Sequence, residues 1–199
     1  AANWKRALAA LALSTASGGI IFTAMTSVVP RYFEISMVSL STSVAVTGLL
    51  AALVYAVASF SQIAVGWLID RYSPRNVLLT MAIGQVVFIY LAAQFNNLAL
   101  FFAMLLAMSF VFGQIPITDA ILSRYVPDSW RARVFSIKFM LNLSIGASVL
   151  PVCGIILPTG YSMTSLFTLM SAIATLIVVA AIILPQQQSD QRLDQAPAK

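Results

Sequence analysis

The chain has 199 residues, of which 60% are hydrophobic and 9% are charged, and its formal net charge is +5. A soluble domain carries about a quarter charged residues, so this composition excludes a water-facing globule and indicates that much of the surface faces lipid. The lack of histidine and the single cysteine, Cys153, exclude a disulfide framework, a cysteine-based metal site and histidine-based catalysis.

Six apolar segments are long enough to span a membrane, because a bilayer core about 30 Å thick needs roughly 20 apolar residues per helix. They lie at about residues 7–29, 41–69, 76–95, 98–125, 131–157 and 160–184. The first begins like a signal peptide, with Lys5 and Arg6 before an apolar stretch, but the apolar run continues to Val29. We therefore predict an all-α membrane protein in which residues 1–185 form one six-helix bundle and residues 186–199 form a polar cytoplasmic tail.

The basic residues predict the orientation of this bundle. If both termini lie in the cytoplasm, ten of the eleven Lys and Arg residues fall on or toward that side, and only Arg31 falls on the other. Cytoplasmic loops of membrane proteins are enriched in Lys and Arg, so we predict cytoplasmic N and C termini. No nucleic-acid partner is expected, since the basic residues sit in short loops and not along a helix face or an arm.

The turn after the second segment carries the most informative motif, Gly66-Trp-Leu-Ile-Asp70-Arg71-Tyr-Ser-Pro-Arg75. It resembles the signature loop of the major facilitator superfamily, in which a glycine is followed by Asp-Arg, a second glycine and two basic residues. Ser73 replaces the second glycine and the following Pro takes a basic position. Such a degraded copy is typical of the second half of a facilitator, so the resemblance implies the C-terminal six-helix half, with its 3+3 inverted repeat, of a twelve-helix transporter.

This resemblance also implies a role for the motif as a latch on the cytoplasmic side. In physical terms, Gly66 permits a close helix crossing and Asp70 can accept hydrogen bonds from the N-terminus of a neighbouring helix. Arginines can pair with carboxylates across the same face. The expected latch residues are Gly66, Asp70, Arg71, Arg75 and Arg131. The alternative is that Arg71 and Arg75 only follow the topology rule.

A second resemblance lies in residues 126–156, which are similar to the cytoplasmic loop and fifth helix of a facilitator half. Gly146, Pro151 and Gly154 belong to this pattern, but Leu150 occupies the glycine position of the Gly-Pro pair found in antiporters of the family. The motif therefore does not support an antiporter. Residues 112–120 resemble uncharacterised bacterial members, which implies a multi-pass protein of the bacterial inner (plasma) membrane.

Two charged residues, Asp119 and Lys138, lie inside predicted helices, where an unpaired charge is costly. From the ends of their helices they lie at depths of roughly 9 and 12 Å, at 1.5 Å per residue. Because the two helices are consecutive and antiparallel, we predict that Asp119 and Lys138 pair directly or through water. The pair is either structural, with a lysine that reaches toward the membrane surface, or Asp119 binds a coupling proton.

Polar and aromatic side chains near the predicted midplane are candidates to face a solute. The resemblance implies that the first, second, fourth and fifth helices line the central cavity. The third and sixth are more uniformly apolar, so we expect them to face lipid. The candidates on the lining helices are Phe22, Thr23, Tyr55, Gln62, Gln114, Thr118 and Asn142. Each one alone is also explained by a hydrogen bond between helices.

The expected function is secondary active transport of a small organic solute across the inner membrane by alternating access. The expected partners are the solute, the lipid bilayer and an N-terminal six-helix half, from the same gene or a second copy, and no cofactor or metal is expected. An intramembrane enzyme would need a base or a second buried acid, and a channel would need a ring of charges. The alternative that stays open is a self-associating six-helix half-transporter or a non-transporting membrane subunit. Because the sequence begins without methionine, we expect a fragment whose first half lies upstream.

Overall fold

The computed structural model describes residues 2–39, 43–156 and 162–185, and within these ranges it is entirely helical. All six helices are long and apolar enough to cross a membrane, which confirms the predicted fold class. The helices are α1 (Ala2–Ser36), α2 (Val44–Arg71), α3 (Pro74–Gln94), α4 (Asn97–Tyr125), α5 (Asp128–Ile156) and α6 (Met163–Ile183). The predicted helix ends at 41, 157 and 160 and the tail at 186–199 lie outside the described residues.

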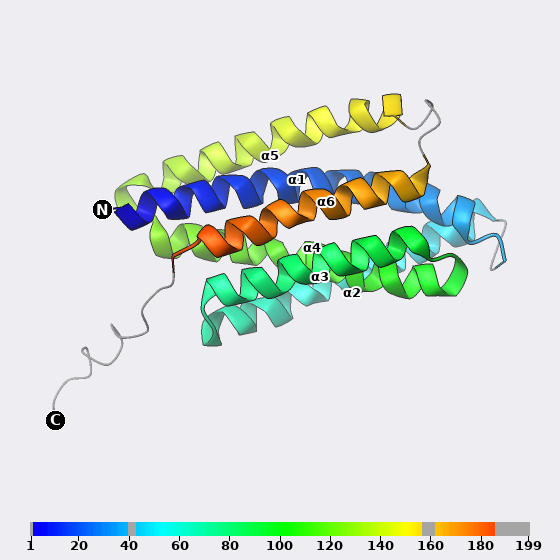
Figure 1. Cartoon of the computed structure of the whole chain (residues 1–199), viewed down its shortest axis with the longest axis horizontal. Helices are drawn as coiled ribbons and strands as arrows, with labels where there is room; N and C mark the ends of the chain where they lie inside the picture. Colours follow the sequence, from blue (N-terminus) through cyan, green and yellow to red (C-terminus); the bar gives the residue numbers. More distant parts are fainter. Residues whose placement is uncertain (1, 40–42, 157–161, 186–199) are drawn as a thin grey trace.

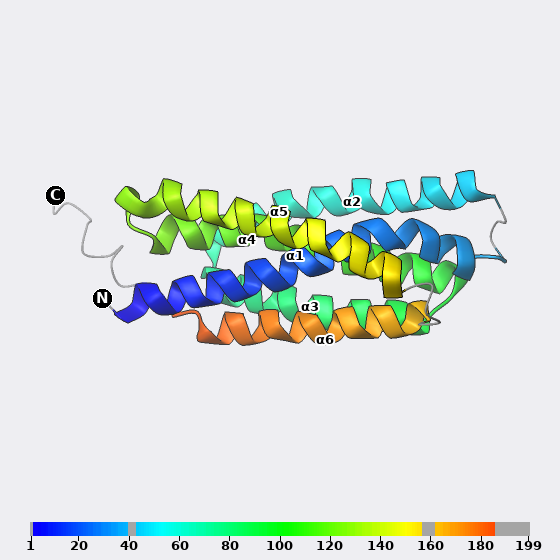
Figure 2. The ribbon, with the colours of Figure 1, turned by 90° about the horizontal axis from the view of Figure 1, so that it is seen from above.

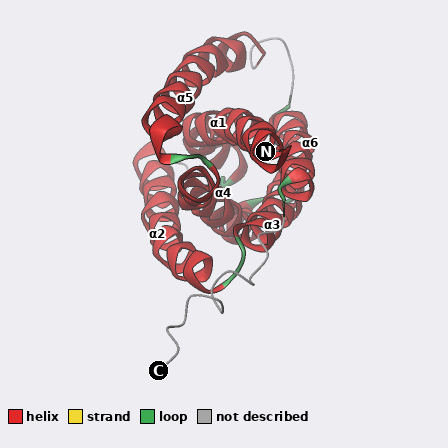
Figure 3. Ribbon diagram, turned by 90° about the vertical axis from the view of Figure 1, so that its left-hand side faces the viewer, coloured by secondary structure: helices red, strands yellow, loops and turns green. Residues whose placement is uncertain are grey.

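The helices run side by side along the long axis of the molecule, with α1 and α4 in the middle (Figures 1 and 2). α1 packs against α2, α4, α5 and α6, and α3 fills the opposite side between α4 and α6. The end view shows α2 and α5 at the edge of the bundle (Figure 3). These two helices bury the smallest share of their residues, 22% and 11% of their most apolar windows, against 44–50% for the other four.

α1 continues past the predicted end at Val29 and passes through Pro30 to Ser36. Proline has no N–H, so the carbonyl four residues earlier, on Thr26, loses its helical donor. The Tyr55 hydroxyl of α2 donates a hydrogen bond to this Thr26 carbonyl at 2.9 Å. The helix therefore survives its proline because a neighbouring helix satisfies the carbonyl that the proline leaves without a donor.

One end of the bundle carries the N-terminus, the α2–α3 turn and the α4–α5 turn (Figure 1). We call it the basic end, because Arg71, Arg75, Arg124 and Arg131 lie there. The Arg124 guanidinium donates to the Ile69 carbonyl in the last turn of α2 at 2.9 Å. Ser73 caps α3 by accepting from the Asn76 N–H, and Pro74 occupies the first turn, where its missing N–H costs nothing. At the basic end, side chains thus satisfy backbone groups at the end of α2 and at the start of α3.

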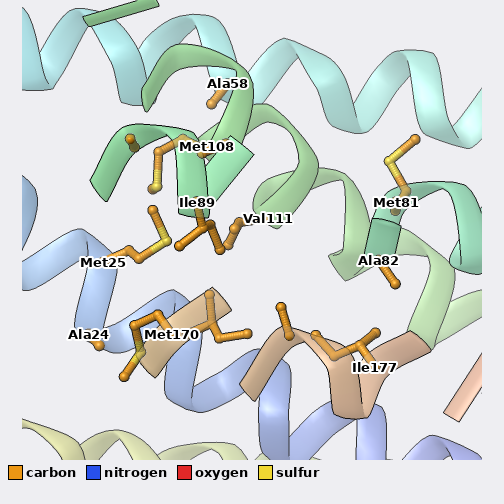
Figure 4. Packing of buried hydrophobic residues seen from close by; sticks show 14 of the residues in the cluster. Ala24, Met25, Ala58, Met81, Ala82, Ile89, Met108, Val111, Met170 and Ile177 are labelled. Atoms are coloured by element: carbon orange, nitrogen blue, oxygen red, sulfur yellow. The ribbon is translucent and has the colours of Figure 1, made fainter. Parts of the chain in front are cut away.

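The interior is packed with small residues and methionines. Figure 4 shows Met25 of α1, Ile89 of α3, Met108 of α4 and Met170 of α6 among them, and each is less than 10% exposed. Flexible methionine side chains fill irregular gaps between helices. Small side chains allow the backbones to approach closely, which favours helix association in lipid.

α3 and α4 pack tightly at Gly84. The Phe110 ring lies over it and stacks on Phe88, with ring centroids 5.5 Å apart. A Cβ atom at position 84 would lie 2.5 Å from Phe110 Cδ1, whereas a Cβ at Gly48 of α2 would meet nothing within 4 Å among the described residues. The same substitution at the two glycines therefore compares a tightly packed helix position with an open one.

We expect Gly84→Ala to destabilise the protein by about 1–3 kcal/mol, because overpacking forces the Phe110 ring out of its stack. The control, Gly48→Ala, should change stability little. Unfolding of the purified protein in detergent with increasing dodecyl sulfate measures both. Equal stability of the two variants would show that the α3–α4 contact is looser than described.

Candidate functional site

A cavity of about 610 Å³ lies between α1, α4 and α5. α5 packs mainly along α1 and touches α4 only slightly, which leaves space between the three helices. Of the seven residues predicted to face a solute, the structure brings five together in the lining of this cavity. These are Phe22 and Thr23 of α1, Gln114 and Thr118 of α4, and Asn142 of α5.

Two adjacent glycines of α1 allow polar side chains to reach this helix. A Cβ at Gly18 would lie 2.7 Å from Gln114 Nε2, and a Cβ at Gly19 would lie 2.6 Å from Asn142 Oδ1. Any larger residue at either position would push these amides away. The glycine pair therefore sets the positions of one amide from α4 and one from α5 on the cavity wall.

The Gln114 amide is fixed by a buried network that spans three helices. Its Nε2 donates to the Ser14 carbonyl of α1 at 3.1 Å, and its Oε1 accepts from Gln85 Nε2 of α3 at 2.8 Å. Gln85 Nε2 also donates to the Phe110 carbonyl at 3.2 Å. Sequence reasoning gave Gln85 no role, although a glutamine in the middle of an apolar helix is the signal that could have identified it.

Asp119 and Lys138 meet where α4 and α5 approach the basic end. Lys138 Nζ contacts Asp119 Oδ1 in an ion pair and donates to Thr118 Oγ1 at 2.9 Å. The two partners differ in exposure, with 9% of the lysine side chain and 43% of the aspartate side chain accessible. Lys138 lines the cavity, whereas Asp119 lies outside the lining. The ammonium is therefore buried against the cavity with its counter-ion behind it.

Thr15 adds a polar atom that sequence reasoning missed. Its side chain is only 6% exposed and lines the cavity on α1. Its Oγ1 has no hydrogen-bond partner among the described residues. A buried hydroxyl without a partner is costly, so the atom is a candidate to contact a bound molecule.

The other two candidates, Tyr55 and Gln62, lie on α2 outside the lining. The Tyr55 hydroxyl bonds to Thr26, as described above, and its ring stacks on Phe112 at a centroid distance of 6.5 Å. Gln62 is half-buried. Tyr55 thus contacts α1 rather than the cavity.

The motif residues Gly66, Asp70, Arg71 and Arg75 gather at the basic end. Gly66 has open space on its Cβ side, and Asp70 is exposed and makes no ion pair or hydrogen bond with the described part of the chain. Arg71 stacks over the Trp67 ring at 3.9 Å, and Arg75 is half-buried. The Cβ side of Gly66 and the carboxylate of Asp70 therefore have no contact with the described part of the chain.

Arg131 contacts its own turn at the start of α5. Its guanidinium donates to the Ser123 carbonyl at 2.9 Å and forms an ion pair with Asp128 at 2.5 Å. These contacts join the end of α4 to the beginning of α5. Arg131 is consequently part of the α4–α5 turn and does not contact the motif residues 66–75 in these interactions.

Three comparisons place the chain among known proteins. The model of the Major Facilitator Superfamily matches residues 7–198. Two solved structures have similar folds, the E. coli fucose:proton symporter FucP as a variant, and FucP in the outward conformation. Each shares 19% sequence identity over 93% of this chain, with TM-scores of 0.74 and 0.73. This chain spans 43% of the length of either solved chain. No curated protein sequence matches it.

We expect the Asp119–Lys138 pair to be coupled energetically by about 1 kcal/mol, a modest value because the six helices leave 43% of the aspartate side chain accessible. Lys138→Met alone leaves Asp119 without its partner, so it should destabilise the protein more than the double variant Asp119→Asn/Lys138→Met. A double-mutant cycle of unfolding free energies in detergent measures the coupling. Strictly additive single variants would mean that the contact contributes nothing to stability.

Proposed function

The chain belongs to the major facilitator superfamily, and from that premise we propose that it is the C-terminal six-helix half of a secondary transporter that moves a small organic solute by alternating access. The observation that carries this proposal is the cavity between α1, α4 and α5, which presents polar groups within helices long enough to span a bilayer. Facilitators bind solutes near the bilayer midplane between two repeats that rock against each other. Membership in this family implies transport and not catalysis.

The partner that we propose is an N-terminal six-helix half, encoded by the same gene or supplied as a second copy. Large apolar side chains remain exposed on both edge helices, including Leu49 and Phe60 of α2 (70% and 68%) and Leu143 of α5 (74%). The similarity to FucP covers 43% of that chain, which leaves room for another half of similar size. A self-associating half-transporter, or a non-transporting membrane subunit, is the alternative. The mass of the denatured chain, compared with the mass of the assembly extracted from its own membrane, separates them.

We propose that the basic end faces the cytoplasm of a bacterium, with both termini on that side of the inner membrane. Arginine-rich turns favour that placement. At this end the latch would consist of Gly66, Asp70, Arg71, Arg75 and Arg131. The open Cβ side of Gly66 and the lack of a partner for Asp70 within the described chain suit contacts to the other half.

The ion pair of Asp119 and Lys138 has two proposed roles. The structural role rests on the depth of the lysine, which needs an anion beside it. FucP is a fucose:proton symporter, and by analogy Asp119 would bind a coupling proton. Uptake measured with and without a pH gradient in Asp119→Asn decides between them, since unchanged proton dependence would leave only the structural role.

Alternating access predicts that water reaches the cavity from each side of the membrane in turn. In a Cys153→Ser background, Thr23→Cys should react with a membrane-impermeant thiol reagent both in intact spheroplasts and in inverted vesicles, because Thr23 lines the cavity. The neighbouring Ala24→Cys is the control, since Ala24 is 1% exposed and should stay unlabelled. Labelling of Thr23→Cys from one side alone would contradict alternating access.

A further inference from the structure

The cavity is chemically uneven along its length. Among the described residues that line it, Lys138 alone carries a formal charge. The wall beyond it on α5 includes Phe139, Leu143 and Leu150, and α4 adds Val111 and Ile115. Leu150 lies about 18 Å from Lys138 along α5 at 1.5 Å per residue. The cavity therefore has one cationic end, and beyond it a mostly apolar wall that also carries the Thr23 hydroxyl and the amides of Gln114 and Asn142.

Lys138 faces the cavity, whereas its counter-ion stands outside the lining. The lysine side chain is 9% exposed and the Asp119 side chain is 43% exposed. Asp119 offsets part of the lysine charge but presents no group to the cavity. Among the described lining residues, the ammonium group of Lys138 is therefore the one charged group that a bound molecule would meet.

Hydrogen-bond donors remain unused at the same end. An ammonium group has three N–H donors and no acceptor. Lys138 uses one toward Thr118 and one toward Asp119, which leaves the third. The Thr15 hydroxyl is buried in the lining and has no partner among the described residues.

Helix geometry places Thr15 and Lys138 at a similar level. Gly18 of α1 faces Gln114 of α4, and the two helices run in opposite directions. Thr15 lies about 4.5 Å from Gly18 toward the basic end, and Thr118 lies about 6 Å from Gln114 toward that end. Since Thr118 bonds to Lys138, the two sets of donors converge on one region of the cavity.

We propose that this cavity binds a small amphipathic carboxylate, whose anionic group accepts hydrogen bonds from Lys138 and Thr15 and whose apolar body lies along α5. The inference rests on the proposed function and assigns its solute class. A cationic solute would meet the ammonium group and is excluded on electrostatic grounds. A neutral solute could accept the same hydrogen bonds but would lack the Coulomb attraction between its own negative charge and the ammonium group, so it would bind more weakly.

The test uses three compounds of the same shape and different charge, 4-phenylbutyrate, 4-phenylbutyramide and 4-phenylbutylamine. Their binding to the protein in lipid nanodiscs is measured by titration calorimetry, with empty nanodiscs subtracted. We expect the carboxylate to bind roughly ten- to a hundred-fold more tightly than the amide, and the amine to show no binding. Equal binding of acid and amide, or tighter binding of the amine, would overturn the proposal.

Two variants distinguish binding of these compounds in the cavity from their partition into the nanodisc lipid. Asp119→Asn/Lys138→Met removes both charges and leaves no unpaired carboxylate, so it should fold and bind acid and amide equally. Lys5→Met, which removes an exposed lysine at the start of α1, should keep the preference for the acid. A preference for the acid that persists in the double variant would overturn the proposal as well.

Transport is measured separately, as counterflow of radiolabelled 4-phenylbutyrate into proteoliposomes that contain the full assembly. Acid-selective binding that depends on Lys138, without counterflow, would uphold the carboxylate site and contradict transport of this compound. Counterflow of other solutes without acid-selective binding would uphold transport and remove the solute class. The two failures are therefore distinguishable.

Discussion

The hydrocarbon interior of a membrane offers no hydrogen bonds, so each polar group within the six helices must find its partner inside the protein. Several contacts between the helices meet this requirement. The Tyr55 hydroxyl satisfies the carbonyl that Pro30 leaves without a donor. Gln85 donates to Gln114, and their amide N–H groups also reach the backbones of α4 and α1, although Gln85 Oε1 has no partner among the described residues. Lys138 takes Thr118 and Asp119. Thr15 has no such partner, and it lies in the cavity.

The cavity is a consequence of how polar contacts are distributed among the helices. α1 holds α4 through Gln114 and leaves room for the Asn142 amide of α5, because Gly18 and Gly19 carry no side chain. α5 is otherwise lightly packed, with 11% of its apolar window buried. α1 and α4 thus form one wall of the cavity, and α5, the least buried of the described helices, forms the other.

Much of this could be predicted from the sequence, for identifiable reasons. Hydropathy identified the six helices, because length and apolarity are what lipid requires. Phe22, Thr23, Gln114, Thr118 and Asn142 were predicted to face a solute and line the cavity. The predicted end of α1 was wrong because Pro30 was taken as the start of a turn. The sequence does not show that the Tyr55 hydroxyl replaces the hydrogen bond that Pro30 removes. Thr15 was missed because a threonine inside a spanning helix looks ordinary until its lack of a partner is seen.

The central claim is that the bundle crosses the membrane with its basic end in the cytoplasm. Asn76, in the first turn of α3, and Asn96, in the α3–α4 turn, are exposed at opposite ends of one helix. Cysteines placed singly at these positions, in a Cys153→Ser background, are treated in spheroplasts with a membrane-impermeant maleimide. The account predicts that Asn96→Cys is labelled and that Asn76→Cys is labelled only after lysis. Labelling of Asn76→Cys in intact spheroplasts would contradict it.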